Sequence, residues 1–310
     1  MSSRSSRLPG GAGRTSGGGV FSKFKTGLTL SKDSLGVIRD HPKLLVFPAM
    51  GALSSLAFWI VFLVPLLVAN LFGSGVEFVV LFVLYFVTTF TATFFTAGLV
   101  FAVNQAFHGE EPSVKASLNA AWQRKGPILV WSAIAATVSV ILKKLEESNS
   151  AVVGILSSLF ALGWSVMTFF MVPVIVFEEV TVTSMFRRSA ETFRETWGES
   201  IGVGRGVTRI QFLVGIVGVA IAVVLALALG AIVPVAGLVL GVFLVGGALV
   251  LTYLLGQTVW GITKTALYVY AAEDRVPEQF ENFDFETLEG RTERPATPGA
   301  VEQPKTHVDD

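Results

Sequence analysis

The chain has 310 residues, of which 52% are hydrophobic and 15% are charged, and its formal net charge is zero. Soluble globular domains carry about 25% charged residues, so this composition argues against an ordinary soluble protein. The chain contains no cysteine, which excludes disulfides and thiolate metal sites.

Long apolar runs without any Asp, Glu, Lys or Arg predict membrane-spanning helices. A helix needs about 20 residues to cross the hydrocarbon core of a bilayer. The last of these runs, residues 210–263, is long enough for two spans joined near Val233-Pro234. The sequence therefore predicts an all-α polytopic membrane protein with six transmembrane helices. The runs cover residues 44–76, 78–109, 126–142, 148–177 and 210–263.

The N-terminal third begins with a Ser-, Gly- and Arg-rich segment, residues 1–19, which is predicted to be a disordered tail. An amphipathic helix is predicted over residues 20–41, and it ends at His41-Pro42 because the residue before proline disfavours helix. Spans one and two are predicted over about Leu44–Phe72 and Phe78–Phe107.

Two further amphipathic helices are predicted, over residues 112–125 and 181–201. Spans three and four lie between them, at Pro127–Leu142 and Ala151–Phe177. The third amphipathic helix has small and apolar residues at spacings of three and four, with Arg and Glu between them. Those residues are Val182, Met185, Phe186, Ser189, Ala190, Phe193 and Trp197.

Spans five and six are predicted over Ile210–Val233 and about Val235–Tyr268. The chain then reads as three units of one amphipathic helix and two spans, which together form one membrane domain over residues 20–272. Residues 273–310 hold eleven acidic residues and four Lys or Arg, and they are predicted to be a largely disordered acidic tail.

Lys and Arg are distributed unevenly between the two sides of this topology. With a cytoplasmic N-terminus, 21 of them lie on the cytoplasmic side and two, Lys143 and Lys144, on the outside. The positive-inside rule thus predicts a multi-pass plasma-membrane protein with both termini cytoplasmic. The amphipathic helices are expected either in the cytoplasmic lipid interface or packed against the ends of the spans.

Polar residues gather on one face of span two and one face of span six. They are candidates for a polar cleft that opens to the cytoplasm. The alternative, favoured for the threonines, is that they pack helices against each other, and Lys264 is expected to snorkel to the surface. The candidate residues are Thr89, Thr93, Thr96, Asn104, Gln257 and Lys264.

No Asp, Glu, Lys, Arg or His occupies the middle of a span, which weighs against an ion-coupled pump. The three histidines are isolated, and the sequence lacks Walker, GxSxG and HExxH motifs. We therefore expect no catalytic residues, no cofactor, no metal and no nucleic-acid partner.

Two stretches carry a resemblance to known proteins: the helix Phe21–Asp40 running into His41-Pro42-Lys43, and Val182–Gly202 with its Arg-Arg-Ser-Ala and Trp-Gly sequences. Over residues 20–272 the pattern resembles an archaeal and bacterial multi-pass membrane protein family of unknown function. It is distantly similar to the membrane domain that anchors some glycerophosphodiester phosphodiesterases. No catalytic residue is implied, because the phosphodiesterase domain of those enzymes is a separate soluble barrel.

These observations favour a non-enzymatic membrane scaffold or accessory protein, in contact with the lipid bilayer and with a membrane-protein partner. The alternative is a transporter or pore for a small uncharged or amphiphilic solute. A membrane enzyme acting on lipid is disfavoured, since no acid–base or metal cluster is present in the sequence pattern.

Overall fold

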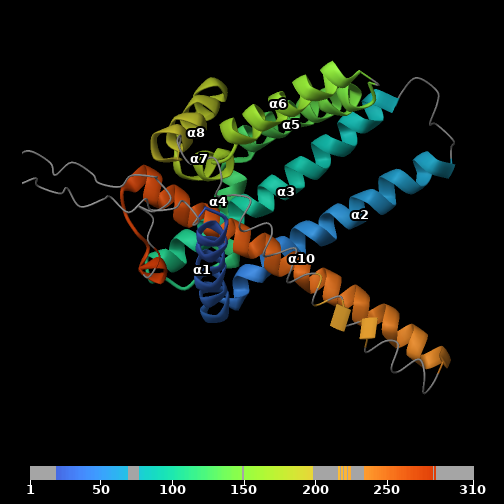
Figure 1. The fold of residues 1–310 in the computed structure, drawn as a ribbon, viewed down its shortest axis with the longest axis horizontal. Coiled ribbons are helices and arrows are strands. Elements are labelled where there is room, and N and C mark those ends of the chain that lie inside the picture. The colour runs from blue at the N-terminus through green and yellow to red at the C-terminus, as the bar shows by residue number, and fades with distance from the viewer. Residues whose placement is uncertain are drawn as a thin grey trace, which may run out of the picture.

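A computed structural model describes residues 19–68, 77–148, 150–197 and 234–281, together with positions 216, 218, 220, 221, 223, 224 and 283. Within these ranges every regular element is a helix (Figure 1), so the all-α prediction is confirmed for the described part of the chain. The α-helices are α1 (Gly19–Asp40), α2 (Val46–Val68), α3 (Glu77–Phe107), α4 (Val114–Gln123), α5 (Lys125–Glu146), α6 (Ala151–Met167), α7 (Met171–Phe177), α8 (Val182–Trp197) and α10 (Pro234–Glu273). Two 3₁₀ turns, η1 (Pro42–Leu45) and η2 (Glu278–Phe280), complete the set.

Five helical segments are long and apolar enough to cross a membrane. They coincide with predicted spans one to four and six, including span three, whose helix α5 is longer than the apolar run suggested. Predicted span five, Ile210–Val233, lies outside the described residues apart from six single positions. The segments are Pro42–Phe62, Phe78–Phe107, Lys125–Glu146, Ala151–Phe177 and Gly241–Glu273.

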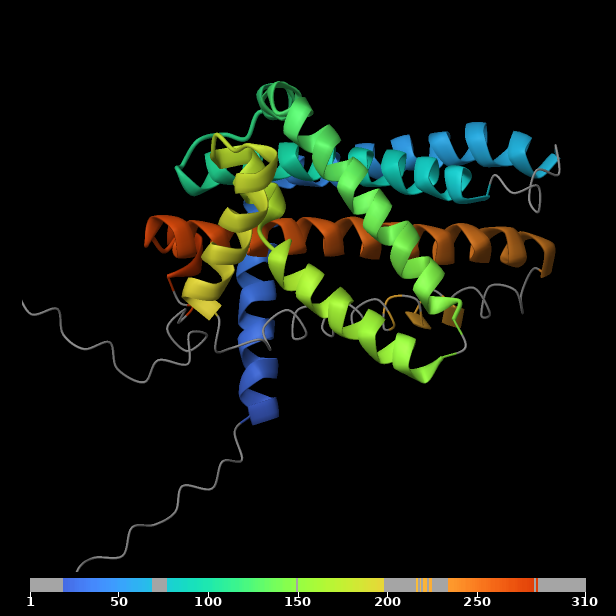
Figure 2. The ribbon, with the colours of Figure 1, turned by 90° about the horizontal axis from the view of Figure 1, so that it is seen from above.

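The helices meet at one end of the molecule and separate toward the other. The axes of α2, α3 and α10 lie roughly parallel in Figure 2, with α2 running opposite to α3 and α10, and α1 crosses them at a steep angle. The short helices α7 and α8 lie beside the C-terminal half of α10, α4 packs against α3, and η2 contacts α1. We call this gathering of α1, α4, α7, α8, η2 and the end of α10 the core end, and the opposite one the open end.

Buried side chains are concentrated at the core end. On α3 the fully buried stretch is Ala97–Val100, followed by buried residues as far as Phe107, and on α10 most residues from Thr258 to Val269 are buried. Nearer the open end of α10, Val242, Phe243 and Val250 are exposed. A surface this apolar is stable only against lipid or another protein.

Glycines allow α2, α3 and α10 to approach closely at the core end. A Cβ on Gly98 would lie 3.0 Å from the ring of Phe47, and one on Gly261 would lie 2.5 Å from Leu99 Cδ2. Small residues serve this purpose in membrane helices because little apolar driving force separates helix contact from lipid contact.

The predicted amphipathic helices 20–41, 112–125 and 181–201 correspond to α1, α4 and α8. Each directs part of its apolar face into the protein: Leu30 and Val37 of α1, Ala121 of α4 and Met185 of α8 are buried. Packing against the spans is therefore one use of these faces. Other apolar side chains stay exposed, including Leu35, Trp122 and Val182.

Candidate functional site

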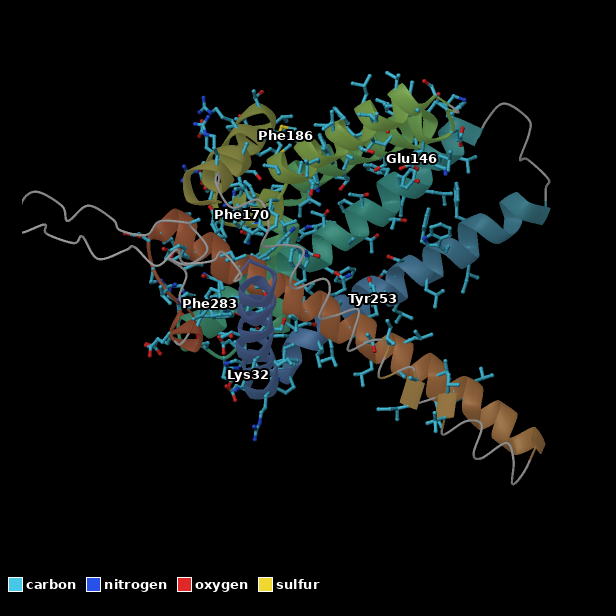
Figure 3. The ribbon with its side chains drawn as sticks, viewed as in Figure 1. Lys32, Glu146, Phe170, Phe186, Tyr253 and Phe283 are labelled. Atoms are coloured by element: carbon cyan, nitrogen blue, oxygen red, sulfur yellow. The ribbon has the colours of Figure 1, made fainter. Side chains whose placement is uncertain are left out.

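The polar stripe of α10 crosses two different environments. Tyr253 and Gln257 face a small cavity between α2, α3 and α10. Trp260, Lys264 and Tyr268, further along the same stripe, lie among aromatic rings of α7, α8 and the turn before α7. Figure 3 shows Tyr253 apart from Phe170, which belongs to the second environment.

The cavity brings together two of the six predicted cleft residues, Thr96 and Gln257. Its volume is about 50 Å³, enough for a few water molecules and far below the roughly 300–1,000 Å³ of a small-molecule site. The cavity is lined by hydroxyl and amide groups set among apolar side chains. Its walls are Pro48, Gly51, Ser55, Ala92, Phe95, Thr96, Leu99, Tyr253 and Gln257.

The remaining threonines and Asn104 do not line this cavity. Thr93 is buried and Thr89 half-buried on α3. The carbonyl of Asn104 accepts a hydrogen bond of 2.8 Å from His108 Nδ1, while its side-chain oxygen has no partner among the described residues. The neighbouring Gln105, which the sequence did not single out, accepts hydrogen bonds from Ser113 N and Ser117 Oγ and so attaches α4 to α3.

Lys264 lies against aromatic rings instead of facing the cavity. Its ammonium is 5.0 Å from the centre of the Phe169 ring and 5.1 Å from that of Trp260. Both distances are within the range of cation–π attraction, which stabilises a cation held away from water. Lys264 therefore belongs to the aromatic cluster at the core end, which also contains Phe170 and Phe193.

A polar network at the core end was missed by the sequence analysis. Arg188 Nε of α8 donates to both carboxylate oxygens of Glu178, at 2.9 and 3.0 Å. The hydroxyl of Tyr268, on α10, donates to Glu178 Oε1 at 2.6 Å. Charge-assisted hydrogen bonds of this kind are among the strongest in proteins, so one carboxylate joins α8 and α10 at the end of α7. The only sequence signal was a carboxylate directly after an apolar run.

Predicted span four is not one continuous helix. It breaks at Thr168–Phe170 into α6 and α7, and the freed backbone N–H of Phe170 donates to Ser189 Oγ of α8 at 3.1 Å. Irregular backbone at membrane depth is stable only where protein or enclosed water satisfies it. Pro173, inside α7, adds a residue that cannot donate a backbone hydrogen bond. Ser189 thereby fixes a bend that the hydropathy pattern does not reveal.

Within the described residues no three His, Asp or Glu side chains lie close enough together to hold a metal ion. That the chain has no cofactor and no catalytic residue remains a prediction.

Comparison with known proteins assigns the chain to one family. Residues 75–278 match the model of a family of unknown function, DUF6159. No curated protein matches, and no solved structure matches. The similarity to the membrane domain of anchored phosphodiesterases and the archaeal or bacterial origin thus remain predictions. The chain belongs to the DUF6159 family, whose matched region begins just before α3 and ends in η2.

Proposed function

We propose that this member of a family of unknown function is a non-enzymatic, six-span membrane scaffold that presents its core end to a partner at the cytoplasmic face. The observation that carries the proposal is the concentration of buried residues at one end, around α1, α4, α7, α8 and η2. An assembly of that kind holds a fixed surface, whereas the apolar helices beyond it serve as the membrane anchor.

A sixth crossing is part of the proposal. Helix α8 lies at the core end, while α10 begins at the open end and returns to the core end (Figure 2). The apolar run that continues through Val233 is long enough to supply the connecting span. The count of Lys and Arg, 21 against two, supports a cytoplasmic core end, cytoplasmic termini and a plasma-membrane location.

The surface offered to a partner is the outer face of α8. Thr183 and Arg187 are exposed there, and Arg187 forms an ion pair of 3.6 Å with Glu191 on the same face. Beneath it, Met185 and Ser189 are buried. A charged surface on a fixed support favours recognition by electrostatic complementarity, with a membrane protein of opposite charge pattern as partner.

Site-specific photo-crosslinking in native membranes tests this proposal. A photoreactive residue replaces Thr183 on α8, and the control carries it at the exposed Val250 on the lipid-facing part of α10. We expect one protein adduct of defined mass from the Thr183 position and lipid adducts from Val250. Equal, heterogeneous adducts at both positions, or none at Thr183 in well-expressed protein, would overturn the scaffold proposal.

A second candidate function is passage of a small uncharged solute, favoured by the meeting of Thr96, Gln257 and Tyr253 at one cavity. Its test is glycerol flux into proteoliposomes, with Thr96→Val and Gln257→Leu compared with the unchanged chain. Flux that falls in both variants while thermal stability is retained would favour transport. Absence of flux above that of empty vesicles would exclude glycerol transport.

A further inference from the structure

An apolar groove lies between α6 and α8, separate from the cavity beside α10. Its volume is about 510 Å³, within the roughly 300–1,000 Å³ range of small-molecule sites. Apolar side chains form most of its wall, and one cation closes it. The lining residues are Leu159, Leu162, Gly163, Val166, Met167, Ala190, Phe193 and Arg194.

Arg194 differs from the other two arginines of α8. Arg187 pairs with Glu191 at 3.6 Å, and Arg188 pairs with Glu178 at 2.9 Å. Arg194 is exposed at the groove and forms no ion pair with any carboxylate that the structure describes. The other residues that line the groove carry no charge that could neutralise its guanidinium.

A second cation lies behind the groove. Phe193, in the groove wall, packs against Phe169 with 5.3 Å between ring centres. The ammonium of Lys264 lies 5.0 Å from the centre of that same Phe169 ring. Lys264 is therefore connected to the groove wall through the Phe169–Phe193 pair, and its positive charge adds to that of Arg194 in this region.

We propose that the groove binds an anionic phospholipid, with one acyl chain along α6 and the phosphate at Arg194. From Met167 to Leu159 the groove follows α6 toward the open end, that is, into the membrane. The apolar walls of the groove would bury the methylene groups of the acyl chain away from water. Basic pockets between membrane helices on the cytoplasmic side bind anionic lipid headgroups. Charge complementarity at Arg194 selects an anionic lipid over a zwitterionic one.

Native mass spectrometry of the full-length protein tests the proposal, with equal amounts of phosphatidylglycerol and phosphatidylcholine added to the detergent. We expect one phosphatidylglycerol to be retained in preference to phosphatidylcholine. Arg194→Gln should lower that retention about fivefold, the factor expected for one Lys or Arg at an anionic surface. Arg187→Gln removes the same charge from α8 outside the groove and should leave retention unchanged.

A steric variant separates the acyl chain from the headgroup. A Cβ on Gly163 would enter open space in the groove, and one on Gly154, elsewhere on α6, would also meet no atom within 4 Å. Gly163→Leu should therefore reduce retention at unchanged charge, whereas Gly154→Leu should not. Equal retention of both lipids, or losses as large in the control variants as in Arg194→Gln and Gly163→Leu, would overturn the proposal. The result is independent of the crosslinking test, because no protein partner is present.

Discussion

At the level of single residues, Tyr268 shows how one hydroxyl stabilises the core end. Its side chain is 2% exposed, and its ring stacks on Phe177 with 5.5 Å between centres. Its hydroxyl meets a carboxylate that also receives Arg188. Because removal of the hydroxyl leaves Glu178 with one partner fewer in a partly buried position, the loss exceeds that of an exposed hydrogen bond.

We expect Tyr268→Phe to lower the free energy of unfolding by about 1.5–3 kcal/mol, the range for a hydrogen bond to a charged group. The measurement is thermal unfolding of the detergent-purified protein followed by tryptophan fluorescence. Tyr253→Phe, at an exposed tyrosine of the same helix, is the control. A Tm reduction of equal size in the two variants would contradict a special role for the Glu178 contact.

Gly261 gives a second test at the level of single residues, because the neighbouring helix decides whether Gly261→Ala stabilises or destabilises the protein. In an open helix position Gly→Ala is stabilising by up to about 1 kcal/mol. At Gly261 the added Cβ would lie 2.5 Å from Leu99 Cδ2, and Leu99 is only 2% exposed, so the side chain cannot move aside freely.

Gly261→Ala should therefore destabilise the protein, by about 1–3 kcal/mol as in other overpacked cores. Gly247→Ala, on the same helix with no atom near the new Cβ, should leave the Tm unchanged or raise it. These changes are compared in the same thermal unfolding assay. A rise in Tm for both variants would show that α3 and α10 are not in close contact at Gly261.

At the level of elements, the break between α6 and α7 depends on one serine. Ser189→Ala leaves the buried N–H of Phe170 without its acceptor, which costs about 1–3 kcal/mol. We expect faster amide hydrogen exchange in peptides that cover the α6–α7 turn. Ser158→Ala, which removes only an exposed bond within α6, should leave exchange there unchanged, and identical exchange in both variants would contradict this role of Ser189.

The same elements show how far the sequence could predict the fold. Hydropathy located the described spans and the 3.6-residue period located α1, α4 and α8, because both patterns arise from local burial. The bend at Thr168–Phe170 lies within an unbroken apolar run, so hydropathy carries no sign of it, although Pro173 just after the bend is a local signal for a break that was not used. The bend is stabilised by Ser189, a residue of the following helix.

The candidate site was predictable only in part, for a similar reason. Spacing placed Gln257 and Lys264 on one stripe of α10, but it could not show that the stripe passes from a cavity to an aromatic cluster. That division depends on Thr96 and Phe169, which come from other helices. Glu178 and Tyr268 are 90 residues apart, and one sequence offers no signal that pairs them.

At the level of the whole molecule, the distribution of positive charge follows the division into a core end and an open end. Most of the Lys and Arg residues that the structure describes lie at the end that collects α1, α4 and α8, while Lys143 and Lys144, in the last turn of α5, lie at the open end. The proposal that the core end is cytoplasmic requires these two ends to face opposite sides of one membrane.

Single-cysteine accessibility measures this directly, because the chain has no cysteine of its own. The exposed positions are Lys115 on α4 and Thr183 on α8 at the core end, and Ser148 between α5 and α6 at the open end. A membrane-impermeant maleimide added to intact cells should label Ser148→Cys, and it should label Lys115→Cys and Thr183→Cys only after the membrane is opened. Labelling of all three from the same side would contradict the account of a membrane-spanning protein with a cytoplasmic core end.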